Sequence, residues 1–272
     1  MSRAKSQREA QSSGPASAPP TARPRTGANR VAAVSPEHLA ALEAGTLASA
    51  TLSEILALDQ QRLLLAVFPG LPADDLPGKE AGILKRMSAI GTLLQQHGGE
   101  AALARCLAHS SDTVRGWACF LLAAMPGAGL AARLEAVRPL ADDPHFGVRE
   151  WAWLALRGHL AAELETAIAL LTPWTCESSE RLRRFACEAL RPRGVWCAHI
   201  ARLKSAPELA LPILQALRAD PAAYVQDSVG NWLNDAGKTR PDWVAALCAG
   251  WLAAGDHPAT VRICKRALRN LK

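Results

Sequence analysis

Five segments of this 272-residue chain resemble one another at regular intervals, and this repeat constrains the fold more than any other feature. Each segment opens on polar residues and runs into an apolar stretch, as in "SSDTVRGWACFLLA" and "DPHFGVREWAWLAL". The segments align on Val114, Val148, Leu182, Val225 and Val261, at steps of 34, 34, 43 and 36 residues. An arginine follows the aligned residue in four of the five segments, and a second helical stretch precedes each segment.

Two helices every 34 to 43 residues predict an all-α, HEAT-like repeat α-solenoid, a curved stack of antiparallel helix pairs. One helix pair cannot bury its apolar face alone, so stacked pairs share a continuous core. An unrelated helical bundle is the alternative fold. The concave side of a solenoid is suited to binding a long ligand.

The chain divides into a tail, residues 1–32, and a helical domain, residues 33–272. The tail is rich in Ser, Ala, Pro, Arg and Gly and holds few large apolar residues, so it is predicted to be disordered. A helix is predicted from Ser35 as the N-cap and Pro36 as the first helical residue. Further helices are predicted over residues 52–68 and 79–97, the latter ended by two glycines.

Charge and composition exclude several classes of protein. The net charge is +6, but residues 1–30 carry a net +5, so the pI does not by itself make the domain a nucleic-acid binder. The sequence has neither a long apolar run nor an apolar N-terminal segment, which predicts no membrane span and no secretory signal. The seven cysteines form no CxxC pair, so buried reduced thiols, no metal site and a cytoplasmic location are expected.

One folded segment is unusually basic. Residues 181–204 hold seven Arg or Lys side chains against one acid, Glu188. At about 100° per residue, Arg181 and Arg184 flank Glu188 on the helix face away from the core. Such a cluster suits phosphate binding, since guanidinium groups pair with phosphates in bidentate fashion. The simpler alternative is that Glu188 pairs with a neighbouring arginine and that Trp196 belongs to the core.

A second unusual segment is "DSVGNWLNDAGKTRPD", residues 227–242, which keeps Asn and Asp inside a predicted helix. On a helical wheel, Val225, Val229, Trp232, Leu233 and Ala236 form the core stripe. The polar residues Asn231, Asn234 and Lys238 lie on the far side. Asp235 lies at the border, where a carboxylate is half-sheltered. A surface face ending in a cap is the alternative interpretation.

Together, "RRFACEALRPRGVW" and "YVQDSVGNWLNDAGKTRPD" resemble the motifs of the AlkC/AlkD-type DNA alkylation-repair glycosylases, closest to the AlkC branch. The resemblance is specific over about residues 178–242 and extends more weakly over residues 50–272. It implies a HEAT-like fold and excision of cationic N3- or N7-alkylated purines, such as 3-methyladenine and 7-methylguanine, from double-stranded DNA. It also implies no cofactor and a monomer.

Carried over by position, the resemblance gives catalytic roles to Asp235, Glu188 and Trp196. Asp235 is the expected main electrostatic stabiliser, assisted by Glu188, with the indole against the nucleotide. The expected DNA-binding residues are Arg149, Arg181, Arg183, Arg184, Arg191, Arg193, Asn231, Asn234 and Lys238.

The sequence departs from the AlkC pattern at one position. AlkC relatives carry an acid before the Phe of an "EFAIRP"-like segment, and His145 stands there in "HFGVRE". Glu150 lies five residues on, at about 200° on its helix, and is not expected to substitute. A non-catalytic protein that binds damaged or branched DNA is therefore the second hypothesis, and a protein-binding solenoid is the third.

Overall fold

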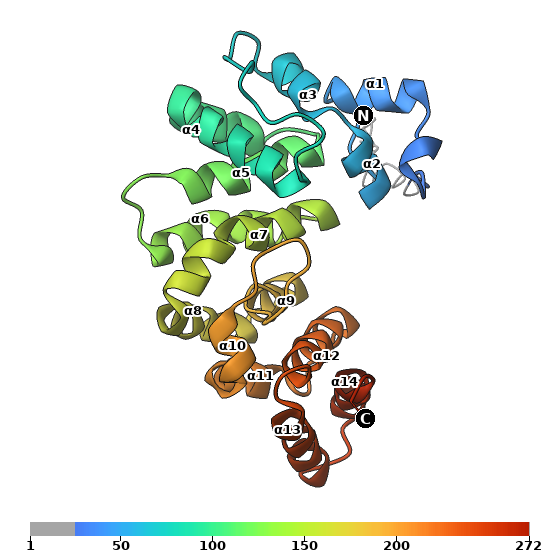
Figure 1. Cartoon of the computed structure of the whole chain (residues 1–272), viewed down its shortest axis with the longest axis vertical. Helices are drawn as coiled ribbons and strands as arrows, with labels where there is room; N and C mark the ends of the chain where they lie inside the picture. Colours follow the sequence, from blue (N-terminus) through green and yellow to red (C-terminus); the bar gives the residue numbers. More distant parts are fainter. Residues whose placement is uncertain (1–24, 272) are drawn as a thin grey trace, which may run out of the picture.

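A computed structural model describes residues 25–271, and every regular element in this range is a helix (Figure 1). None of these helices has both the length and the apolar composition that a membrane span needs. The elements in chain order are η1 (Val31–Ala33), α1 (Pro36–Glu43), α2 (Leu52–Ala57), α3 (Gln60–Val67), α4 (Ile83–Leu107), α5 (Asp112–Ala124), α6 (Leu130–Ala141), α7 (Phe146–Ala162), α8 (Leu164–Leu171), η2 (Thr172–Cys176), α9 (Glu180–Glu188), α10 (Ala201–Ser205), η3 (Pro207–Ala210), α11 (Leu211–Leu217), α12 (Ala223–Gly237), α13 (Pro241–Ala253) and α14 (Pro258–Leu268).

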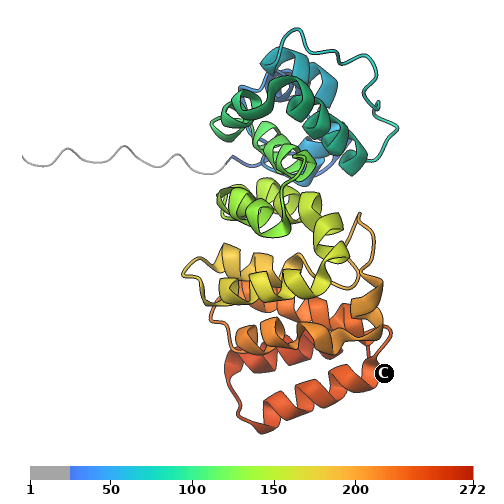
Figure 2. The ribbon, with the colours of Figure 1, turned by 90° about the vertical axis from the view of Figure 1, so that its left-hand side faces the viewer.

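The helices stack as pairs along one axis (Figures 1 and 2). The second helix of each predicted repeat is α5, α7, α9, α12 or α14, and successive members of this series pack on one another. The helices α4, α6, α8, α11 and α13 stand before them in the chain and form the other layer. The predicted all-α, HEAT-like solenoid is therefore confirmed.

The core follows the predicted stripe in four repeats and shifts in the fifth. Val114, Val148, Leu182 and Val225 are buried, but Val261 is 43% exposed. Thr260 is buried in its place and donates a hydrogen bond to the Arg218 carbonyl at 2.9 Å. The alignment on Val261 is therefore wrong by one residue. In the other four repeats the aligned residue lies three positions after the N-cap, and in α14, whose N-cap is His257, that position is Thr260.

The arginine after the aligned residue has a structural role in three repeats. The Nη1 atoms of Arg115, Arg149 and Arg183 each donate to two loop carbonyls five and six residues earlier, at 2.8–2.9 Å. Arg115 also pairs with Asp143 at 2.8 Å, and Arg183 with Asp220 at 2.6 Å. Each of these carboxylates belongs to the loop before the next second helix, so the pairs join neighbouring repeats.

Residues 25–32, the C-terminal part of the predicted tail, pack against the helical domain. Arg25 donates to both carboxylate oxygens of Glu54, at 2.8 and 2.5 Å, and Glu54 is fully buried. This pairing holds the pKa of Glu54 at about 2. Residues 25–32 are therefore packed on α2 rather than disordered, which corrects that part of the predicted tail; residues 1–24 lie outside the described range.

The N-terminal helices match the prediction in part. Ser35 caps α1, with Pro36 as its first residue. The single helix predicted over residues 52–68 is in fact two, because the chain leaves helical geometry at Leu58 and Asp59 caps α3 with its side chain. The predicted stop at the glycine pair appears as a break at Gly99, whose φ is +49°.

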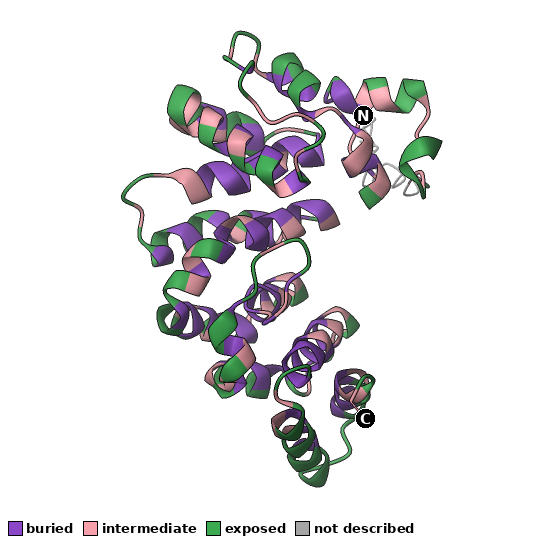
Figure 3. Cartoon of the chain, viewed as in Figure 1, coloured by how far each residue is buried: buried purple, intermediate pink, exposed green. Residues whose placement is uncertain are grey.

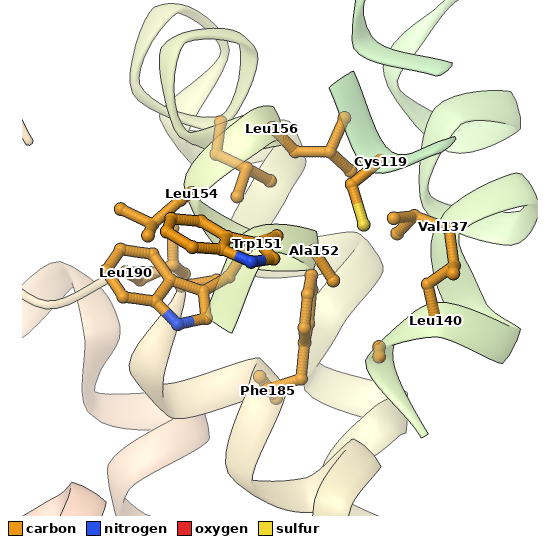
Figure 4. Close-up of a cluster of buried hydrophobic side chains, with 14 of the residues drawn as sticks. Cys119, Val137, Leu140, Trp151, Ala152, Leu154, Leu156, Phe185 and Leu190 are labelled. Atoms are coloured by element: carbon orange, nitrogen blue, oxygen red, sulfur yellow. The ribbon is translucent and has the colours of Figure 1, made fainter. Parts of the chain in front are cut away.

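Buried residues recur along the helices of both layers (Figure 3), and the apolar ones form one core cluster. Figure 4 shows Trp151 and Ala152 of α7 between Phe185 of α9 on one side and Cys119 and Val137 on the other. Five of the seven cysteines are buried as free thiols, as expected. The core thus continues from repeat to repeat and holds the second helices in a fixed register.

Candidate active site

A cavity of about 460 Å³ lies where α2, α7, α9 and α12 meet. Its size falls in the range of small-molecule sites. Gly147 of α7 lets α2 approach closely, since a Cβ there would lie 2.9 Å from the Ile55 side chain. The lining residues are Leu52, Ile55, Phe146, Gly147, Glu150, Trp151, Trp153, Leu154, Arg184, Glu188, Arg191, Val195, Trp196, Tyr224, Asp227, Ser228 and Asn231.

Six charged side chains of alternating sign form one chain of ion pairs that begins at this cavity and ends at an exposed lysine. The consecutive N–O distances along the chain are 2.7, 3.7, 2.8, 2.6 and 3.2 Å. Its members, in order, are Glu150, Arg184, Glu188, Arg191, Asp235 and Lys238. A guanidinium or an ammonium thus stands beside every carboxylate, and the described residues form no cluster suited to a metal ion.

Glu188 is the buried acid of the cavity wall. Its side chain is 5% exposed, so it does not stand on an open helix face as the wheel suggested. One oxygen accepts from Arg191 at 2.8 Å and the other from Ser228 at 2.6 Å. Burial raises the pKa of Glu188, but Arg184, Arg191 and the Ser228 hydroxyl outweigh that effect and the pKa is lowered. The site therefore holds an anion where little water can screen it.

Asp235 lies behind Arg191 and does not line the cavity. Arg191 donates to one Asp235 oxygen through Nε and Nη2, at 2.9 and 2.6 Å, and Lys238 reaches the other at 3.2 Å. Asp235 and Glu188 are therefore close together, as the motifs predict, and Arg191 is the partner that they share. The geometry, however, favours Glu188 over Asp235 as the carboxylate nearer to a bound ligand.

Trp196 stands at the cavity on the loop between α9 and α10. It is 51% exposed, which excludes the alternative that it is a core residue. Its φ of +64° is sparsely populated for a bulky residue and is found where surrounding structure enforces it. Arg157 supplies that support, because its guanidinium donates to the carbonyls of Ala189, Arg191 and Ala198 at 2.6–3.0 Å.

Tyr224 lies between two arginines that the sequence assigned to DNA. The Arg184 guanidinium lies 4.5 Å from the ring centroid and that of Arg149 lies 5.4 Å from it. Arg149 also donates to the Tyr224 hydroxyl at 3.2 Å. Cation–π contacts of this kind hold both guanidinium groups against Tyr224, and of the two arginines Arg184 lines the cavity.

The other predicted DNA-binding arginines differ in their exposure and in their hydrogen-bond partners within the protein. Arg183 is 12% exposed and occupied by Asp220 and two loop carbonyls, so it does not face the cavity. Arg181 donates to the Asp142 carbonyl and is 37% exposed. Arg193 donates to the Asp235 carbonyl at 3.2 Å.

The two asparagines of α12 do not lie on one open polar face. Asn234 is 2% exposed and donates to the Ala267 carbonyl, so the prediction that it faces a ligand is wrong. The reason is that α14 packs along α12 and covers the side that the wheel left to solvent. Asn231 lines the cavity, and its oxygen accepts from Arg266 and Arg269 at 3.0 and 3.2 Å.

The two residues of the AlkC departure lie in different places. His145 caps α7, accepting from the Gly147 N–H at 3.1 Å, and its Nε2 contacts the Ser49 carbonyl at 2.7 Å. Glu150, not expected to substitute for an acid, lines the cavity close to Glu188 through Arg184. The wheel of α7 alone could not show this, because α9 and α12 form the rest of the cavity wall.

Comparisons with known proteins agree with this fold. Residues 148–249 match the family model described as DNA alkylation repair enzyme. The uncharacterized protein YhaZ of Bacillus subtilis is 38% identical over 143 residues, 53% of this chain and 39% of YhaZ. The alkylpurine DNA glycosylase AlkC of Pseudomonas fluorescens, solved bound to DNA containing an abasic site analog, superposes with a TM-score of 0.62 at 24% identity, over 90% of this chain and 65% of AlkC. AlkD2 of Streptococcus mutans gives 0.57 at 22% identity, over 71% and 91%. The chain thus spans less than two thirds of YhaZ and of AlkC.

Proposed function

We propose, from the match of residues 148–249 to the DNA alkylation repair enzyme family, that the chain is a DNA glycosylase. The proposed substrates are cationic purines alkylated at N3 or N7, such as 3-methyladenine and 7-methylguanine, in double-stranded DNA. The reaction is hydrolysis of the bond between the base and the deoxyribose.

One observation carries the proposal: the ionised Glu188 lies in the wall of an aromatic cavity that also contains the exposed Trp196. An alkylated purine of this kind is already positively charged, so it leaves without a general acid. Positive charge then develops on the sugar, and a nearby anion in a poorly solvated site stabilises it strongly. The Trp196 indole offers a face for the cationic nucleotide.

Three residues from the predicted catalytic and DNA-binding sets stabilise the ionised form of Glu188 or hold its partners in place. Arg184 and Arg191 keep Glu188 ionised, and Asp235 anchors Arg191. We propose Glu188 as the carboxylate that faces the substrate and Asp235 as a positioning residue. Arg149, Arg181, Arg193 and Lys238 are only partly buried or exposed, which leaves them able to bind phosphates.

A row of cations on α14 provides a further phosphate-binding surface that the sequence reasoning missed. Lys265, Arg266 and Arg269 lie three, four and seven residues after Arg262, so the four share a helix face about 100° wide. Residues 258–271 contain no acid. Asp227 and Asn231 of the cavity wall bond to Arg262, Arg266 and Arg269, so the row lies directly beside the cavity.

Replacing Lys265 and Arg269 together with alanine is expected to weaken DNA binding and its salt dependence. Each lost phosphate contact reduces the slope of log K against log salt by about 0.9, so the double variant should lose about 1.8. Fluorescence anisotropy with a 20-base-pair duplex at several salt concentrations measures this slope. Arg202→Ala, on α10 in a pair with Glu165, is the control and should keep the wild-type slope.

The proposed function is tested by incubating the purified chain with methylated duplex DNA and identifying released bases by chromatography. Release of 3-methyladenine or 7-methylguanine supports it. Binding without any release on either substrate would favour a non-catalytic DNA-binding protein. One observation keeps that second function open: His145 is a helix cap, so its position offers no carboxylate.

A further inference from the structure

Glu150 differs from the other acids of the charged chain in being accessible from the cavity. Its side chain is 32% exposed, whereas those of Glu188 and Asp235 are 5% and 6% exposed. Both oxygens of Glu188 accept from Arg191 and Ser228, and those of Asp235 from Arg191 and the exposed Lys238. Glu150 is therefore the acid of the charged chain that water in the cavity reaches most readily.

The direction of the Glu150 carboxylate is fixed by two donors. Its Oε1 pairs with Arg184 Nη1 at 2.7 Å, and its Oε2 accepts from the Trp153 indole N–H at 2.9 Å. An ionised carboxylate has about four acceptor positions, so each oxygen keeps one for a further partner. The group is thus both oriented and able to bind water in the cavity.

Asp227 is the other exposed acid of the cavity wall, at 38%, and its surroundings differ. One of its oxygens pairs with Arg262 at 2.8 Å and with Arg266 at 3.2 Å. Two cations of the α14 row therefore share this carboxylate, which lies on the side of the phosphate-binding surface. Glu150 instead shares Arg184 with Glu188, the anion proposed to face the sugar.

We propose that Glu150 is a catalytic residue that binds the attacking water and accepts its proton; this inference rests on the proposed glycosylase function. The bond from C1′ to the purine nitrogen breaks, and its electron pair leaves with the cationic base, which becomes neutral. The water oxygen bonds to the electron-deficient C1′ beside Glu188. One water proton passes to the Glu150 carboxylate, which later returns it to solvent. The products are the free base and an abasic site.

The test compares Glu150→Gln with the matched variant Glu165→Gln, at an acid of α8 that pairs with Arg202 and does not line the cavity, under single-turnover conditions. Base release from methylated duplex should fall about 100-fold or more in E150Q, the range of general-base effects, and by less than about threefold in E165Q. The dissociation constant for DNA, from anisotropy, should remain within about twofold of wild type in E150Q. Melting curves verify that both variants are folded.

Chemical rescue separates a catalytic role from a structural one. Formate added to Glu150→Ala should restore part of the release, since a small carboxylate can enter the vacated space, and should not affect the wild type. Wild-type release that E150Q retains, or an E150A variant that formate does not rescue, overturns the role of Glu150 and leaves the proposed function intact. Absence of release by the wild type overturns the proposed function itself.

Discussion

Replacing Glu188 with glutamine is expected to reduce base release by about 100- to 1,000-fold, the usual effect of removing one electrostatic stabiliser from an active site. The amide keeps the shape of the carboxylate and can still accept from Arg191 and Ser228, but it carries no charge to oppose the developing cation on the sugar. Single-turnover release from methylated duplex is the measurement. The affinity for DNA should not fall, because the carboxylate that is lost is negative and makes no attraction to phosphates.

Ser228→Ala is the matched control for Glu188→Gln. It removes one hydrogen bond from the same carboxylate, at 2.6 Å in the wild type, and leaves the charge and both guanidinium partners in place. We expect it to keep release within about tenfold of wild type, the equivalent of one ordinary hydrogen bond to a charged group. Equal loss in both variants would mean that packing, rather than charge, accounts for the role of Glu188.

Replacing Arg191 with alanine is expected to destabilise the protein by about 3–5 kcal/mol, the usual cost of leaving buried carboxylates without their partner. Arg191 is 14% exposed and is the one group that joins Glu188 to Asp235 among the described residues. Urea unfolding followed by circular dichroism measures the free energy of unfolding. Arg202→Ala removes an exposed pair with Glu165 and should leave that free energy within experimental error.

The deficit of Arg191→Ala should depend on pH in a defined direction. The pKa of Glu188 is lowered in the folded wild type, so its ion pairs contribute stability above the unfolded pKa and lose it as the pH falls through the folded pKa. Without Arg191 the folded pKa rises. The gap between variant and wild type should therefore narrow as the pH is lowered from 7.5 toward 4.5. A gap that is constant over this range would argue against the charged network as its source.

The sequence was sufficient to predict the repeat and most of the core. Helical period, caps and step length are local properties, and they led to the solenoid and to a stripe in which Val225, Val229 and Trp232 are all buried. The motifs also predicted that Glu188, Asp235 and Trp196 come from one region. Arg191 joins the two acids, while Glu188 and Trp196 line the same cavity.

What the sequence could not predict depends on a third helix. A helical wheel assumes one buried side, but α12 is covered by α9 and by α14, which buries Asp235 and Asn234. Glu150 was discounted for the same reason, since its angle on α7 is uninformative about a cavity that α9 and α12 complete. The four cations of α14 are visible in the sequence as positions three, four and seven residues after Arg262, outside the basic segment 181–204.

The arginines that join successive repeats also limit how far neighbouring repeats can move relative to one another. The ion pairs Arg115–Asp143 and Arg183–Asp220 each connect two neighbouring repeats, and their low exposure reduces screening by salt. Ion pairs between neighbouring repeats are expected to make the solenoid resist bending. If the chain binds a duplex as proposed, most of the deformation would occur in the DNA, so flexible pyrimidine–purine steps near the lesion would cost least to accommodate.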